Sequence, residues 1–355
     1  MRRVLFVAGV AAITALAAGC SSSSSGSSGS SGGTSSASAE SASVTIRLGF
    51  LANITHAPAL VGLEKGFFTK NLGKNVTLKT SVFSSGTQET TALLAGQLDA
   101  AYVGPNPALS AWQKSGGKAI RIISGAASGG AALVVKPSIS SPGQLKGQKL
   151  ATPSLGNTQD VALRYWLKQH GLTSTATSGG DVPITPIKPN SDAVLEFKSG
   201  QIAGGWEPAP YDIEMVQDGG KQLVNEASLW PGGKFVTTNL VVTQSFLAAH
   251  PSVVTGLLKG QIAATSYLNS DPSAAAAAAN AELTTLLGKG LKSSVLAASF
   301  KQITFTNDPI ASSLATDSQH AVAIGLQQPV NLSGIYDLGP LNALLKADGE
   351  AQVSS

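Results

Sequence analysis

Stretches with the alternating pattern of a β-strand and stretches with helical periodicity follow one another along most of the chain, beginning at Val44. Val44–Phe50 alternates, and the helical stretch Ala57–Lys65 follows it and ends at Gly66. This order predicts strands joined by helices that cover both faces of a sheet, an α/β fold with mostly parallel strands. The further strands predicted in this first set are Val76–Val82, Leu98–Val103 and Arg121–Ser124.

A second set of strands and helices begins after Lys136-Pro137. Beyond Gln244 every segment has a helical pattern. The chain is therefore expected to form two α/β units followed by a helical C-terminal tail, and ligands of such folds bind at the carboxyl ends of strands. The strands predicted in this second set are Gln148–Ala151, Val182–Ile187, Ile202–Trp206 and Phe235–Thr243.

One helix of the second set, predicted from about Thr158 to His170, carries a periodic charge pattern. Asp160, Arg164 and Lys168 recur every four residues, with the acid before the bases. Residues four apart share one face of a helix. We expect this face to be turned toward solvent.

The N-terminus has the pattern of a secretory signal peptide. Arg2 and Arg3 precede an apolar run that ends in the small residues before Cys20, the single cysteine of the chain. Residues 1–19 are thus predicted to be a signal peptide, and Cys20 resembles the lipid-bearing cysteine of a bacterial lipobox. Residues 20–43 consist almost entirely of Ser, Gly, Ala and Thr, a composition typical of a flexible tether.

Composition and spacing exclude several classes of function. The formal net charge is +4, and no run of Lys and Arg suggests a nucleic-acid partner. The four histidines are far apart, and Cys20 supplies the single thiol, so neither a metal site nor a catalytic cysteine site is predicted. A formal G-x-S-x-G at residues 29–33 lies in the tether, where no strand and helix can hold a nucleophile. We expect neither an enzyme nor a bound cofactor.

A series of short motifs extends from residue 56 to residue 208 in a fixed order. In chain order they are His56–Ala59, Glu64–Phe68, Phe83–Gly86, Leu94–Ala100, Val103–Ala108, Leu145–Lys149, Phe197–Ile202 and Trp206–Pro208. Together they resemble the substrate-binding proteins of nitrate, aliphatic-sulfonate and taurine ABC importers. That superfamily also includes binders of thiamine pyrimidine precursors.

The resemblance implies a two-lobed clamshell, the type II periplasmic-binding-protein fold. Lobe one would comprise residues 44–130 and 240–355, and lobe two residues 131–239, with hinges near Ala131–Lys136 and Phe235–Thr243. It further implies a monomer that serves an ABC permease and a cytoplasmic ATPase, held at the outer face of the cell membrane by a lipid on Cys20.

Three predicted loops after strands lead into helix N-termini, which are favourable places for an anion. They contain Ser85-Gly86-Thr87, Asn106 and Asn157-Thr158, with Asn106 and Asn157 as N-caps. Side chains of these types donate hydrogen bonds without a full charge. The same residues also suit helix capping alone, and both interpretations stay open.

Further candidates are less specific. Ser128-Gly129 precedes the first crossing between lobes, where glycine suits either a ligand contact or a hinge. Trp206 and Glu207 end a strand, and both can contact a ligand. Alternatively, Trp206 packs in the core and Glu207 stabilises the N-terminus of the next helix. His56 can donate to an anion, contact a heterocycle, or be a structural histidine.

The ligand class follows from the resemblance. A small organic anion of the aliphatic-sulfonate, taurine or nitrate type is expected. A thiamine pyrimidine precursor is the alternative and rests chiefly on His56. The related pyrimidine synthases carry a cysteine-rich iron motif, and a chain with one cysteine departs from that pattern.

Overall fold

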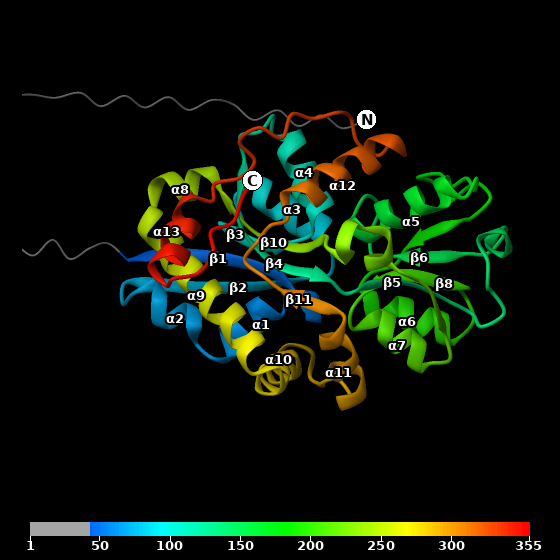
Figure 1. Cartoon of the computed structure of the whole chain (residues 1–355), viewed down its shortest axis with the longest axis horizontal. Coiled ribbons are helices and arrows are strands. Elements are labelled where there is room, and N and C mark those ends of the chain that lie inside the picture. The colour runs from blue at the N-terminus through cyan, green and yellow to red at the C-terminus, as the bar shows by residue number, and fades with distance from the viewer. Residues whose placement is uncertain (1–42) are drawn as a thin grey trace, which may run out of the picture. The chain divides into compact units, whose positions relative to one another are not determined.

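The computed structural model describes residues 43–355, which contain two β-sheets (Figure 1). The six-stranded sheet has the order β11-β4-β10-β3-β1-β2, and the five-stranded sheet the order β7-β6-β8-β5-β9. The strands of the six-stranded sheet are β1 Val44–Leu51, β2 Val76–Phe83, β3 Ala100–Val103, β4 Ile120–Gly129, β10 Val236–Thr243 and β11 Ile303–Phe305. Those of the five-stranded sheet are β5 Ala131–Val135, β6 Leu150–Thr152, β7 Ile184–Pro186, β8 Gly204–Pro208 and β9 Lys221–Asn225.

Helices cover both faces of each sheet, as the sequence predicts. Around the six-stranded sheet, α1, α2, α9 and α10 pack on one face and α3, α4 and α12 on the other (Figure 1). The α-helices are α1 Ala57–Glu64, α2 Phe67–Leu72, α3 Gly86–Leu94, α4 Pro105–Lys114, α5 Thr158–Gln169, α6 Asn190–Lys198, α7 Tyr211–Gln217, α8 Gln244–Ala249, α9 Pro251–Ser270, α10 Pro272–Leu287, α11 Ser293–Lys301, α12 Ala311–Ala323 and α13 Gly339–Ala347. Short 3-10 turns are η1 Ile54–His56, η2 Pro142–Leu145, η3 Glu226–Leu229 and η4 Pro231–Gly233.

Both sheets are mixed, and the expectation of mostly parallel strands is met: four of the six strands in one sheet and four of the five in the other run in the same direction. In the six-stranded sheet β1 pairs in parallel with β2 and β3, whereas β10 runs antiparallel to β3 and β4. In the five-stranded sheet β5 runs antiparallel to β8 and β9. The reason is the path of the chain: β4 continues into β5 through Gly130 alone, and β10 brings the chain back in the opposite direction. Strand and helix patterns do not encode strand direction. The whole of β10 belongs to the six-stranded sheet, including residues 236–239, which the predicted boundary places in lobe two.

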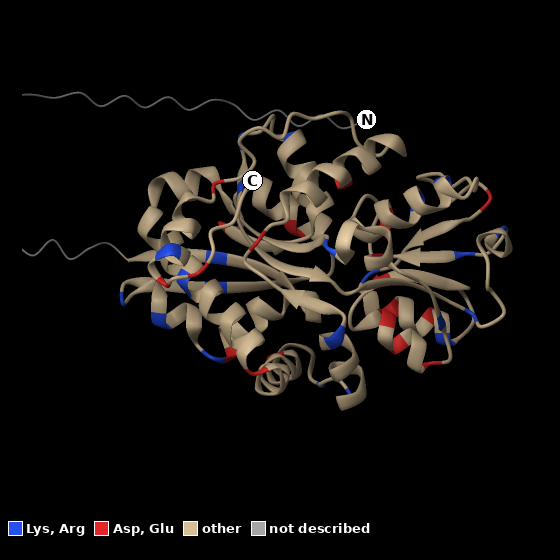
Figure 2. Ribbon diagram, in the orientation of Figure 1, with Lys and Arg blue, Asp and Glu red and all other residues tan. Residues whose placement is uncertain are grey.

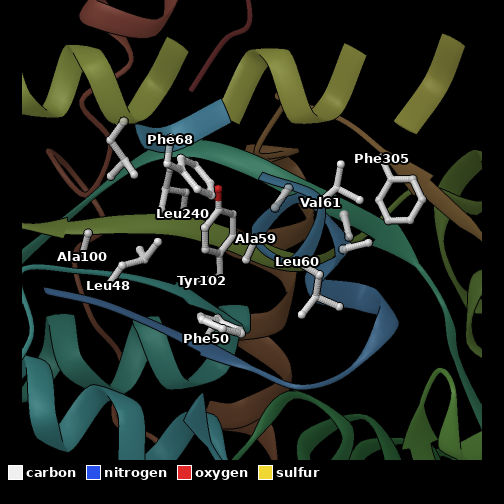
Figure 3. Packing of buried hydrophobic residues seen from close by; sticks show 14 of the residues in the cluster. Leu48, Phe50, Ala59, Leu60, Val61, Phe68, Ala100, Tyr102, Leu240 and Phe305 are labelled. Carbon is white, nitrogen blue, oxygen red and sulfur yellow. The ribbon is translucent and has the colours of Figure 1, made fainter. Parts of the chain in front are cut away.

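The largest hydrophobic cluster lies between the six-stranded sheet and α1, α2, α9 and α10. Phe68 of α2 lies at its centre, with its ring 6.4 Å from that of Tyr102 on β3 (Figure 3). Gly62 of α1 and Gly260 of α9 face this ring, and a Cβ on either would lie within 2.5 Å of it. These two glycines therefore allow α1 and α9 to approach Phe68 closely.

The five-stranded sheet packs against α5 through Trp206, whose ring lies 6.3 Å from that of Trp166. On the same helix the structure corrects the predicted solvent-facing stripe. Asp160 is fully buried and Arg164 nearly so, and they form an ion pair of 2.9 Å. Asp160 also accepts from Thr152 and from the Gly156 N–H, so these residues tie the first turn of α5 to β6 and the preceding loop. Tertiary packing thus buries two of the three residues of the predicted stripe, and Lys168 is exposed as expected.

We predict that Gly260→Ala destabilises the fold by about 1–3 kcal/mol, because the added methyl group overpacks against Phe68. Urea unfolding monitored by circular dichroism measures the change. Lys259→Ala, at the neighbouring exposed position of α9, is the matched control and should change stability by less than about 0.5 kcal/mol. Equal stability of the two variants would contradict the packing argument.

Candidate functional site

A small buried cavity of about 30 Å³ lies between segments of the two sheets, with room for about two or three water molecules. The six-stranded side contributes the ends of β1 and β3, the start of α3 and part of β10. The five-stranded side contributes the loop before α5, the start of α6 and the end of β8. The lining residues are Leu51, Asn53, Thr55, His56, Gly86, Gly104, Pro107, Pro153, Asn157, Thr158, Gln159, Asn190, Pro208 and Thr237.

Five helices of the described chain begin at this lining. His56 is the N-cap of α1, Gly86 the first residue of α3, Gly104 the N-cap of α4, Thr158 the first residue of α5 and Asn190 the first residue of α6. The N–H groups of a first helical turn have no intrahelical acceptor, and the helix dipole places partial positive charge there. Five such starts around one cavity favour an anion. The prolines in the first turns of α1 and α4 carry no N–H, so these two helices contribute chiefly through their dipoles, and α3, α5 and α6 contribute N–H groups as well.

Neutral polar side chains complete the lining. Asn190 is buried, and its Nδ2 has no hydrogen-bond partner. Asn157 caps α5 by accepting from the Asp160 N–H at 2.9 Å, while its Nδ2 donates to Gln159. No lining residue is Lys, Arg, Asp or Glu. Over the described chain the charged positions are spread over helices, loops and some strands (Figure 2).

His56 is held as a neutral ring. It is 3% exposed, and its Nδ1 accepts a hydrogen bond of 3.2 Å from the Leu51 N–H. Burial lowers the pKa of His56 to about 3. The ring proton therefore belongs on Nε2, and the side chain offers a donor without a charge at neutral pH.

The two sides of the cavity touch. The Thr87 and Ser154 hydroxyls lie 3.0 Å apart, and the ring of Tyr165 on α5 stacks on His320 of α12 at 3.7 Å. A Cβ on Gly104 would lie 2.5 Å from Thr158 Oγ1. Glycine at position 104 therefore allows the start of α5 to come up to the start of α4.

The structure brings four of the predicted site residues to the cavity: His56, Gly86, Asn157 and Thr158. The predicted N-cap role of Asn157 is confirmed. Two others from the same loops have structural partners: Ser85 is fully buried and caps α3 by accepting from the Gln88 N–H at 3.4 Å, and Thr87 contacts Ser154 across the cavity edge.

Ser128 and Gly129 lie at the crossing between the sheets, outside the cavity lining. The Ser128 hydroxyl accepts from the Phe235 N–H at 3.3 Å, and the Gly129 carbonyl accepts from Thr237 at 2.5 Å. Gly129 has a φ of +82°, and a Cβ there would lie 2.5 Å from the Gln302 carbonyl oxygen. This position requires glycine because its φ is positive and the backbone of Gln302, just before β11, approaches it closely.

Asn106, Trp206 and Glu207 also lie outside the lining. The predicted N-cap role of Asn106 is wrong: α4 begins two residues earlier than predicted, at Pro105, with Gly104 as N-cap, because proline suits the first helical position. The Asn106 Nδ2 instead donates to the Asp317 carbonyl at 3.4 Å. Trp206 is a core residue that donates to Glu226 at 2.7 Å. Glu207 is fully buried without a partner, and burial, with a contribution from Asp212, raises its pKa well above the ordinary value.

Sequence reasoning missed several polar lining residues. Asn53 lies two residues after the end of β1, and Asn190 follows Pro189 at a helix start, so the rule used for the other loops could have found both. Thr237 lies inside β10, where no local signal exists. The lining residues that were missed are Asn53, Thr55, Gln159, Asn190 and Thr237.

Within residues 43–355, no group of His, Cys, Asp and Glu side chains is arranged to hold a metal ion. The same residues include no helix with the length and hydropathy needed to cross a membrane. Cys20, the predicted lipid attachment site, the signal peptide and nearly all of the tether lie outside the described residues.

We predict that the His56 ring stays neutral, with its proton on Nε2, from pH 5 to pH 8, because its pKa lies below this range. Nitrogen-15 NMR of the imidazole ring measures both the charge and the tautomer. Imidazolium signals from His56 appearing near pH 6 would contradict the burial and the contact with Leu51.

Comparison with known proteins agrees with this architecture. The E. coli (strain K12) taurine-binding periplasmic protein is 27% identical over 207 residues, which are 58% of this chain and 61% of that protein. The alkanesulfonate-binding protein of Xanthomonas axonopodis pv. citri bound to MOPS superposes with a TM-score of 0.68 at 16% identity, covering 83% of this chain and 98% of that one. The periplasmic nitrate-binding protein of Synechocystis PCC 6803 gives a TM-score of 0.69 at 15% identity, covering 86% and 89%.

The two-lobed α/β fold of periplasmic binding proteins is thereby confirmed. The chain matches 61–63% of the length of its curated relatives. The model of the NMT1-like family matches residues 39–283. This chain belongs to the NMT1-like family.

Proposed function

We propose that this protein is the extracytoplasmic solute-binding component of an ABC importer and binds a small anion in the cavity between its two lobes. The observation that carries the proposal is the convergence of five helix N-termini on a lining with no acidic side chain. The proposed ligand class is that of the relatives named for taurine, alkanesulfonates and nitrate.

Neutral donors suit a protein that must release its ligand. Helix N–H groups and hydroxyl and amide side chains stabilise an anion without a lysine or arginine partner. The neutral ring of His56 adds a donor of the same kind. We propose that the protein binds this anion rather than transforming it, and that a thiamine pyrimidine precursor is the competing ligand because His56 can also contact a heterocycle.

The lobes are proposed to move about the two chain crossings. Lobe one would contain the six-stranded sheet and lobe two the five-stranded sheet, joined at Gly130 and through residues 226–235. Closure would bring α5 against α4 and α12, as the contacts of Thr158 and Tyr165 support. We further propose a monomer that docks on a permease with a cytoplasmic ATPase, anchored outside the membrane by a lipid on Cys20.

We predict that methanesulfonate, taurine or nitrate raises the melting temperature of the full-length chain, whereas pyrimidine thiamine precursors do not. A ligand that binds only the folded state adds about 2.7 kcal/mol at a hundred times its Kd. Thr158→Val should raise the Kd of the anion by about tenfold or more, because it removes a hydroxyl donor from the start of α5. Thr91→Val, at an exposed position of α3, is the matched control. A shift with the pyrimidine alone would reject the anion proposal.

We also predict that Gly104→Ala lowers the affinity for the same anion by about tenfold, because the added methyl group clashes with Thr158 and hinders lobe closure. Isothermal titration calorimetry measures the affinity. In a Thr158→Ala background, which lacks the clashing oxygen, Gly104→Ala should have little further effect. Additive losses in the double variant would show that the contact does not limit closure.

A further inference from the structure

A groove of about 750 Å³ opens beside the anion cavity. One wall consists of the end of β2 and the connection between α10 and α11, and the other consists of α6 and α7. Leu51, Asn53 and Asn190 line both the cavity and the groove. The two spaces are therefore neighbours, and these three side chains border both of them.

The groove presents apolar side chains that the fold leaves open to solvent. Leu195 is 63% exposed, Leu287 51% and Val82 43%, and all three line it. They come from both walls: Leu195 from α6, Val82 from β2 and Leu287 from the end of α10. Exposed apolar side chains that gather in one concave region of a protein typically mark a binding surface.

Among the charged residues of the groove, Lys198 pairs with Asp218 at 3.1 Å. Burial raises the pKa of Glu214, and the nearby Lys289 and Lys292 oppose that shift. The exposed apolar side chains of the groove suit an uncharged hydrocarbon segment.

Because the two spaces differ in size, we expect them to hold different parts of the ligand. A cavity of about 30 Å³ takes an anionic head group but not the carbon chain attached to it. An organic anion seated there must extend its chain outward, and the groove that shares Asn190 and Leu51 provides an apolar path. Because its walls come from both sides of the cavity, lobe closure would enclose a chain placed in it.

We propose that the ligand is an amphiphilic organic anion, with its head in the anion cavity and its apolar chain in this groove against Leu195, Leu287 and Val82. The proposal rests on the anion-binding function proposed above and specifies its ligand class. It excludes an inorganic anion as the preferred ligand.

The test is a chain-length series measured by isothermal titration calorimetry on the full-length chain. The probes are nitrate, methane-, butane- and octanesulfonate, and the carboxylates acetate, pentanoate and nonanoate. Within the head-group class that binds, affinity should rise by about fourfold for each methylene group buried. Flat affinity along the series, or nitrate binding more tightly than every organic anion, would overturn the assignment of the groove.

Variants separate the groove from the cavity. Leu195→Asn combined with Leu287→Asn should abolish the rise in affinity with chain length and leave methanesulfonate affinity unchanged, because both positions are exposed and outside the cavity and the substitutions add no charge. Leu229→Asn, at a position 48% exposed and outside the groove, is the matched control. If affinity rises with chain length as steeply in the double variant as in the unmodified protein, the groove does not bind the chain. Binding of the shortest anions without any slope would overturn the groove alone, whereas failure of every anion to bind would overturn both proposals.

Discussion

The return of the chain into the six-stranded sheet as β10 is the constraint on which the site depends. All eight residues of β10 are buried, and the strand lies between β3 and β4. Its insertion forces the antiparallel pairings, fixes the second crossing and places Thr237 in the cavity lining. The hydrogen bond from Thr237 to the Gly129 carbonyl ties this crossing to the first one. The two chain crossings are therefore held together beside the cavity.

The starts of several helices place partial positive charge around the cavity. Single helix starts are common in α/β folds, but here starts from both sheets face one small space. Asp160 and Glu207 are buried next to lining residues in the sequence: the Asp160 carboxylate pairs with Arg164, and burial raises the pKa of Glu207 well above its ordinary value, which favours its uncharged form. In the proposed function such a site would bind an anion by dipoles and neutral donors, and the apolar groove beside it would add selectivity through the ligand's chain.

Local sequence rules succeeded where the cause was local. Asn157 caps α5 because an amide side chain next to a first turn can accept its N–H groups. The same rule failed at Asn106 because α4 begins at Pro105, two residues before the predicted start. Asp160 and Arg164 have the spacing of a helix face, but that face meets β6 and its loop instead of water.

By itself, the sequence determined the alternation of strands and helices, the α/β class, most element boundaries and several of the loops that carry helix starts. Those properties follow from periodicity, glycine and proline positions and capping residues, which act within a few residues. Only the tertiary structure decided which strands run antiparallel, the burial of the Asp160–Arg164 pair, the presence of Thr237 and Asn190 at the cavity, and the groove beside it. These depend on segments far apart in the chain coming together, and no local pattern records which segments will meet.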